Sequence, residues 1–122
     1  MPQTRVVFYR EADGTVPIVD WFDALPKKAL DKCRVKIGRL RELGHELRRP
    51  EADFLRDGIY ELRIRLQWTN YRVLYFFHGD TAAIVSHGII KERLVPAKEI
   101  DRAVGRKRRF AADPVTHTYE EA

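Results

Sequence analysis

The sequence contains very little cysteine and no long apolar stretch. Cys33 is the only cysteine among 122 residues, so no disulfide can form within the chain, and a lone thiol is compatible with a reducing cytosol. No run of about eighteen apolar residues occurs, and the short apolar run at residues 6–9 lies between Arg5 and Arg10. We therefore expect a cytoplasmic protein that is neither exported nor bound to a membrane.

The motifs of several enzyme classes are also absent. The chain has no Gly-Lys-Ser/Thr phosphate loop, no Cys-x-x-Cys, no His-Glu-x-x-His and no Gly-x-Ser-x-Gly. His78 and His87 fall on neighbouring predicted strands, but two histidines without an acidic cluster are more often ordinary polar side chains than metal ligands. We therefore expect no metal and no small-molecule cofactor.

What the sequence does contain is an excess of positive charge. The 23 Lys and Arg residues outnumber the 18 Asp and Glu residues, which gives a formal net charge of +5. Such a balance favours a polyanionic partner, and the planar guanidinium of arginine suits bidentate contacts to phosphate. RNA and an acidic protein are the leading candidates. With 44% hydrophobic residues, the length suits a single domain over residues 1–122.

Hydrophobic patterning predicts an α+β fold for this domain. Four runs rich in β-favouring residues are expected to be strands, the last three of them an antiparallel meander: residues 5–10, 59–66, 71–78 and 82–87. Three segments have helical apolar spacing: residues 15–25, with Thr15 as the cap, residues 27–46 and residues 96–110. We expect a loop at residues 48–58 and a frayed tail at residues 113–122.

This order predicts a small antiparallel sheet packed on two N-terminal helices, with a C-terminal helix added. Along strand 59–66 the residue types alternate, so that an apolar set and a charged set face opposite sides: Tyr60, Leu62 and Ile64, then Glu61, Arg63 and Arg65. We expect the helices to share one face of the sheet. The charged set would then project from an open opposite face.

Two groups of cations are candidates for RNA binding. The helix at 27–46 carries a stripe, Lys28, Lys32 and Lys36, although such a stripe is also typical of a solvated helix face. The strands and the segment after them carry Arg63, Arg65, Arg72, Lys91 and Arg93. Converging cations repel one another, so such a cluster costs stability unless an anion such as an RNA phosphate occupies it. Alternatively, Glu61 pairs with Arg63 or Arg72 in surface ion pairs.

The two tryptophans have different expected roles. Trp21 lies on the apolar-rich first helix and is expected in the core. Trp68 falls in the predicted hairpin loop at residues 67–70, where an exposed indole can stack on a nucleobase.

Three segments on the predicted strands carry a resemblance to a known family. They are residues 58–63 (GIYELR), 71–75 (YRVLY) and 87–93 (HGIIKER), followed by Pro96 before a helix. In this order they resemble the RelE/ParE toxin superfamily, closest to its HigB-like, phage-derived type II toxins. The resemblance extends over residues 6–110. Two positions depart from the pattern: Glu61 stands where some members have a second lysine, and Pro96 and Ala97 stand where others have a tyrosine.

The resemblance implies a toxin of a type II toxin–antitoxin system that is neutralised by a helix-turn-helix antitoxin. In the RelE-like branch it implies an endoribonuclease, or mRNA interferase, that inhibits translation by cutting mRNA in the decoding site of the ribosome. Arg63, Arg72 and Lys91 match basic positions that such toxins use at the scissile phosphate.

The expected chemistry is RNA cleavage without a metal. The ribose 2′-OH attacks the adjacent phosphate, which requires a proton acceptor, stabilisation of charge on phosphorus and protonation of the leaving group. Arg63 and Arg72 would clamp the phosphate, Lys91 would transfer a proton, and either Glu61 or His87 would be the base. Two alternatives stay open: a ParE-like inhibitor of DNA gyrase, and a non-catalytic phage-derived domain that binds RNA or a partner.

Overall fold

The computed structural model describes residues 3–80, 82–91 and 93–121. The elements are, in chain order, β1 (Arg5–Tyr9), α1 (Pro17–Asp23), α2 (Lys27–Leu43), the short 3-10 helix η1 (Gly44–Glu46), β2 (Ala52–Arg56), β3 (Ile59–Leu66), β4 (Thr69–His78), β5 (Ala82–Ile90), α3 (Ala97–Ala112), α4 (Pro114–His117) and β6 (Thr118–Tyr119). The predicted α+β class and the C-terminal helix are confirmed. No helix in the described residues is long and apolar enough to cross a membrane.

The strands form one sheet with the order β2-β3-β4-β5-β1-β6. The predicted antiparallel meander is confirmed, because β3 pairs with β4 and β4 pairs with β5 in antiparallel fashion. The sequence analysis did not specify where the N-terminal strand pairs. β1 lies parallel to β5, with Val7 opposite Ile84, and thereby makes the sheet mixed.

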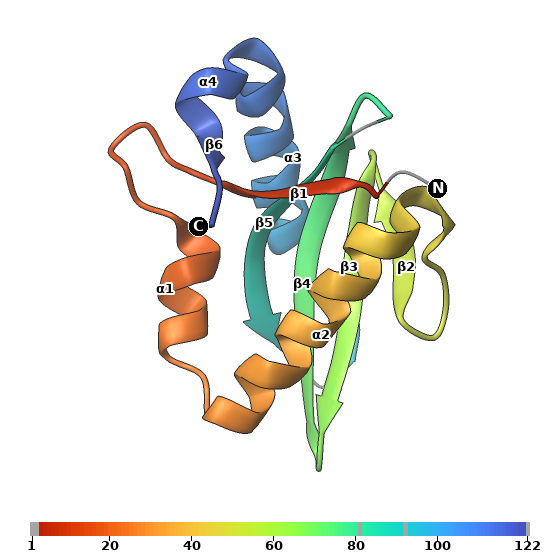
Figure 1. The fold of residues 1–122 in the computed structure, drawn as a ribbon. Coiled ribbons are helices and arrows are strands. Elements are labelled where there is room, and N and C mark those ends of the chain that lie inside the picture. Colours follow the sequence, from red (N-terminus) through yellow and green to blue (C-terminus); the bar gives the residue numbers. More distant parts are fainter. Residues whose placement is uncertain (1–2, 81, 92, 122) are drawn as a thin grey trace.

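The two faces of the sheet carry separate apolar clusters. On one face, α1 and α2 bury side chains such as Phe22, Cys33 and Leu40 against Leu62 and Tyr75. On the other face α3 packs, and Figure 1 shows it on the opposite side of the sheet from α1 and α2. The expectation that all helices share one face, with the other left open, was therefore wrong.

The apolar stripe of α3 explains this second layer. Ile100, Ala103 and Phe110 recur on one side of the helix and are buried against sheet residues that include Leu74 and Phe76. A sheet with apolar side chains on both faces needs a cover on each to remove them from water. α3 covers only part of the sheet face on which it packs. The charged residues of β3 and β4 lie on this face beyond the apolar cluster.

The helix ends differ in detail from the prediction. α1 has Val16 rather than Thr15 as its N-cap, with Pro17 in the first turn. α2 ends at Leu43, because Gly44 takes a positive φ of 53° while its N–H donates to the carbonyl of Leu40. The following residues to Glu46 form η1 rather than a continuation of the α-helix.

The segment at 48–58 is not all loop, since it contains β2. This strand pairs with β3 across the turn residues Asp57 and Gly58, which have φ values of 53° and 81°. Positive φ at both central residues is the mark of a type I′ hairpin, for which Asp-Gly is a preferred pair. The Asp-Gly dipeptide was thus the signal that could have predicted β2.

Residues 113–121 are ordered rather than frayed, contrary to the expectation, and residue 122 lies outside the described residues. Asp113 caps α4 by accepting from the backbone N–H of Thr116, and β6 pairs with β1. Glu120 and Glu121 form ion pairs with Arg5 and Arg34. These partners were invisible to the sequence analysis because they come from β1 and α2.

Candidate functional site

The register of β3 and β4 brings two of the predicted site residues together. Arg63 on β3 lies directly opposite Arg72 on β4. Side chains opposite each other on an antiparallel pair share one face of the sheet at close range. The face is the one on which α3 packs, since Glu61, two residues before Arg63, pairs with Leu74 of the α3 cluster.

Glu61 joins the two arginines. One carboxylate oxygen, Oε2, accepts from Nε of Arg63 at 3.0 Å, and Oε1 lies 3.2 Å from Nε of Arg72. The ion pairs weighed in the sequence analysis are thus present, but Glu61 is only 4% exposed, so they are not surface pairs. The anion that such a cationic cluster needs for stability is supplied within the protein by Glu61.

Two residues that sequence reasoning missed extend this cluster at the edge strand. Asp53 on β2 lies opposite Glu61 and is 3.4 Å from Nη2 of Arg63. Arg49 donates to the same carboxylate at 2.7 Å, and this hydrogen bond is the main cause of the lowered pKa of Asp53. They were missed because β2 was expected to be a loop. We call Arg49, Asp53, Glu61, Arg63 and Arg72 the arginine cluster.

Both central arginines keep access to solvent and further N–H groups. The side chain of Arg63 is 35% exposed and that of Arg72 is 14% exposed. The contacts described for Arg72 use Nε and Nη1, the second as a donor to the Tyr71 carbonyl at 3.2 Å. A guanidinium carries five N–H donors, so each can still meet an external oxyanion. The arginine cluster can therefore bind a phosphate at the surface.

Arg65 lies further along β3, and Lys91 directly follows the end of β5. Arg65 pairs with Asn70, and the backbone N–H of Lys91 donates to the Asn70 carbonyl at 3.0 Å. Both side chains are exposed, and Arg65 donates from Nε to the Gln67 carbonyl at 3.1 Å. The cations therefore continue beyond Arg63 and Arg72 toward the tip of the β3–β4 hairpin.

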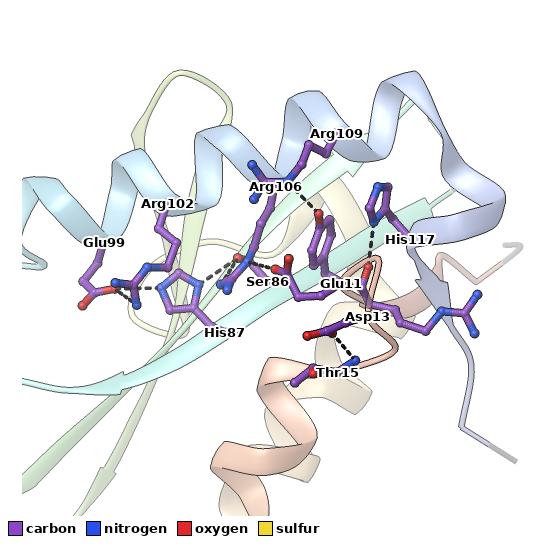
Figure 2. A network of polar contacts seen from close by, with 12 residues as sticks. Glu11, Asp13, Thr15, Ser86, His87, Glu99, Arg102, Arg106, Arg109 and His117 are labelled. Carbon is purple, nitrogen blue, oxygen red and sulfur yellow. Dashed lines mark hydrogen bonds and ion pairs between the residues drawn. The ribbon is translucent and has the colours of Figure 1, made fainter.

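His87 is not part of this cluster. It lies opposite Leu74, which separates it from Glu61 in the same row of the sheet, and its ring is 5% exposed. Nδ1 lies 2.8 Å from Oγ of Ser86, and Nε2 lies 3.1 Å from the Glu99 carboxylate of α3 (Figure 2). Burial, together with the nearby charge of Arg106, lowers the pKa of His87 to about 4.

A register shift explains how two successive residues of β5 reach α3. Leu74 pairs with His87 but Tyr75 pairs with Val85, so Ser86 is an extra residue on β5. Its hydroxyl accepts from Nη1 of Arg106 at 3.4 Å, and Arg106 also donates to Glu11 at 3.0 Å (Figure 2). We call Glu11, Ser86, His87, Glu99 and Arg106 the buried polar network. Both ring nitrogens of His87 are occupied within it.

The lysine stripe on α2 is partly engaged by other parts of the protein. Lys32 donates to the Arg65 carbonyl at 3.1 Å, and Lys36 donates to Glu51 at 3.1 Å. Hydrogen bonds from Arg39 and Lys36 lower the pKa of Glu51 to about 2. Lys28 is exposed.

The tryptophans occupy different environments. Trp21 packs on the core in edge contact with Tyr71 and covers Gly88 so closely that a Cβ there would overlap its ring. Its predicted core position is confirmed. Trp68 is 87% exposed in the turn between β3 and β4 and lines a surface groove together with Lys91 and Arg93.

Comparison with known proteins gives one family. The model of the family described as phage derived protein Gp49-like (DUF891) matches residues 20–108. This range contains the second half of α1, all of α2, the arginine cluster and most of α3. No curated protein matches the chain significantly.

Proposed function

The chain belongs to the phage-derived Gp49-like family, and from this membership we propose that it is the toxin of a type II toxin–antitoxin pair. We place it in the HigB-like branch of the RelE/ParE superfamily. In this proposal the protein acts in the cytoplasm as an endoribonuclease that cuts mRNA on the ribosome and requires no metal. A helix-turn-helix antitoxin neutralises it by covering the arginine cluster.

The observation that carries the proposal is the opposed pair Arg63 and Arg72 with Glu61 between them. Within the arginine cluster three guanidinium groups face two carboxylates, Asp53 and Glu61, and both Arg63 and Arg72 still reach solvent. Such an arrangement supports binding of a further anion. In the proposed complex, a phosphate takes over part of the hydrogen bonding that Glu61 has in the unbound protein.

Each residue then has a role in the reaction. The arginines stabilise the charge that develops on phosphorus, and this is the largest expected effect. Glu61, released in part from its arginine contacts, accepts the proton of the 2′-OH as its oxygen bonds to phosphorus. The bond to the 5′-oxygen breaks, and the Lys91 ammonium gives that oxygen a proton. The products are a 2′,3′-cyclic phosphate and a 5′-hydroxyl.

The remaining predicted residues take binding or structural roles in this proposal. Arg65 and Arg93 would contact the RNA near the cut, whereas Lys28, Lys32 and Lys36 would contact the backbone of ribosomal RNA. We assign His87 no proton transfer, because its ring nitrogens already contact Ser86 and Glu99 and its pKa of about 4 makes it a weak base. Its role is to hold α3.

The test is primer extension on mRNA from a translation reaction to which the purified protein is added. We expect cuts that require ribosomes, persist with chelator and decrease by roughly a hundredfold in Arg72→Ala, because one stabilising donor group is lost at the phosphate. Arg72→Lys should recover little, because it keeps the charge but loses the planar fork.

Arg108→Ala is the matched control, since Arg108 is an exposed arginine on α3 that lies outside the arginine cluster. Thermal unfolding of each variant checks that the domain is folded. Intact mRNA with the wild-type protein would refute the nuclease and point to a gyrase inhibitor or a binding domain without catalysis.

A further inference from the structure

A groove lies at the tip of the β3–β4 hairpin, beyond the arginine cluster. Its volume is about 530 Å³, within the range of pockets that take small molecules, and seven residues line it: Trp68, Thr69, Asn70, Ile90, Lys91, Arg93 and Leu94. Three of them are large apolar side chains that are strongly exposed, at 87% for Trp68, 88% for Leu94 and 54% for Ile90. Exposed apolar side chains gathered at one place mark a binding surface.

The charge of the groove narrows the choice of ligand. Lys91 and Arg93 line it, and no acidic residue does so among the described residues. A matching ligand therefore combines an apolar, preferably planar, group with negative charge. A nucleotide has both, because its base has two flat faces and its phosphate is an anion.

The position of the groove relates it to the arginine cluster. The strand pairs run in order from Arg63 and Arg72 to Arg65 and Asn70, and then to the turn that holds Trp68. Trp68 lies four residues from Arg72, about 13 Å along the strand at the usual rise. Ile90 is opposite Tyr71 and so lies on the other face of the sheet from Arg72, which places the groove around the end of the sheet. A single strand of RNA held at the arginines can pass this end and bring a nearby nucleotide to the groove.

We propose that this groove binds an unpaired RNA base next to the phosphate held by Arg63 and Arg72. The base stacks on the Trp68 indole, Ile90 and Leu94 form the apolar wall, and Lys91 and Arg93 contact the flanking phosphate. The inference rests on the proposed function and adds to it a substrate feature, a base that is not paired. A protein segment would match Lys91 and Arg93 only if it carried acidic side chains beside an apolar group.

The test measures binding apart from cleavage. The probes are a short single-stranded RNA with 2′-O-methyl groups, which cannot be cut, and the same RNA with one base removed at each position in turn. The proteins are the wild type, Trp68→Ala and the control Val35→Ala, which removes another exposed apolar side chain, 64% exposed on α2.

We expect Trp68→Ala to weaken binding of the intact RNA about tenfold, the size of one base–aromatic stack, and Val35→Ala to leave it unchanged. Removing the base that stacks should weaken the wild type by a similar factor and have no further effect in Trp68→Ala. Binding should also quench tryptophan emission in the wild type but not in Trp68→Ala, since Trp21 is partly buried against the core and away from the groove lining.

Equal affinity of the wild type and Trp68→Ala for the intact RNA would overturn the inference, even if the protein cuts mRNA on ribosomes. If RNA binding depended on Trp68 but the protein did not cut mRNA, the proposed nuclease activity would be refuted. The groove would still be an RNA-binding site. If Trp68→Ala kept its RNA affinity but lost the antitoxin encoded beside its gene, the groove would belong to a protein partner and the inference would be wrong.

Discussion

The arginine cluster and the buried polar network lie on the same face of one sheet, and both pair arginine with carboxylates. The difference lies in how their arginines are used. Arg106 is 12% exposed, donates to Glu11 and Ser86, and lies over the ring of Tyr9 at 5.6 Å. Arg63 is 35% exposed and keeps donors for an external anion. An arginine therefore indicates an anion-binding site when some of its N–H donors remain available to an external partner. Its positive charge alone is not sufficient.

Among the changes that test this difference between the two regions, Arg106→Ala should have the largest effect on stability. The substitution removes hydrogen bonds from Glu11 and Ser86 and a contact with Tyr9, so it should lower the free energy of unfolding by about 2–3 kcal/mol. The cleavage rate of the folded protein should change little. Urea unfolding and primer extension measure the two quantities.

The neighbouring exposed arginine gives the control for this experiment, because Arg108→Ala should change neither quantity. A stable Arg106→Ala protein that had lost cleavage would show that the buried polar network belongs to the active site, and the distinction between the two regions would fail.

The second effect is the pH dependence caused by His87. Its pKa is about 4 in the folded protein against an ordinary value of 6.5, and Glu99, Arg102 and Arg106 are the charged groups around it. Because the unfolded chain binds the proton more readily, stability is complete above pH 6.5 and is lost as the pH falls toward 4. We expect a loss of about 2 kcal/mol between pH 7 and pH 5.

Denaturant unfolding at several pH values measures this loss, and His87→Gln provides the reference for all other groups. The pH dependence of the wild type should exceed that of His87→Gln over this range. Parallel curves would mean that the pKa of His87 in the fold is close to its ordinary value.

The smallest effect is expected at the surface, where Glu51 pairs with Lys36 and Arg39. The side chains of Glu51 and Arg39 are 22% and 41% exposed, so solvent weakens these ion pairs despite the lowered pKa of Glu51. Glu51→Gln should cost less than about 1 kcal/mol at pH 7, and added salt should reduce the difference. A cost as large as that of Arg106→Ala would remove the contrast between surface and buried ion pairs.

Local patterns in the sequence were sufficient to predict most elements of the fold. The alternation along β3 placed Leu62 and Ile64 in the core and Arg63 on the other side, and the helical spacing of Cys33, Ile37 and Leu40 predicted α2. These patterns depend on neighbours within one element, so no tertiary information was needed. The short connection between two predicted strands indicated that β3 and β4 pair, but the predicted link at 67–70 is longer than the observed turn at 67–68, so the pairing of Arg63 with Arg72 was not specified.

The parts that could not be predicted depend on contacts between distant segments. The stripe of Ile100, Ala103 and Phe110 predicted a helix but not the face of the sheet on which it packs. Arg106 and Arg109, near the end of the predicted C-terminal helix, contact Glu11 and Tyr9, which are far away in the sequence, so local spacing could not indicate these contacts. The extra residue Ser86 on β5 had no signal in the sequence.

The place of β1 has a consequence for how the protein is made. β1 is synthesised first but lies between β5 and β6, so its partners leave the ribosome last (Figure 1). The β2–β4 hairpins can form from local contacts, whereas the sheet cannot close around β1 until residue 119 has been added. A chain that ends before β5 therefore leaves β1 without its parallel neighbour.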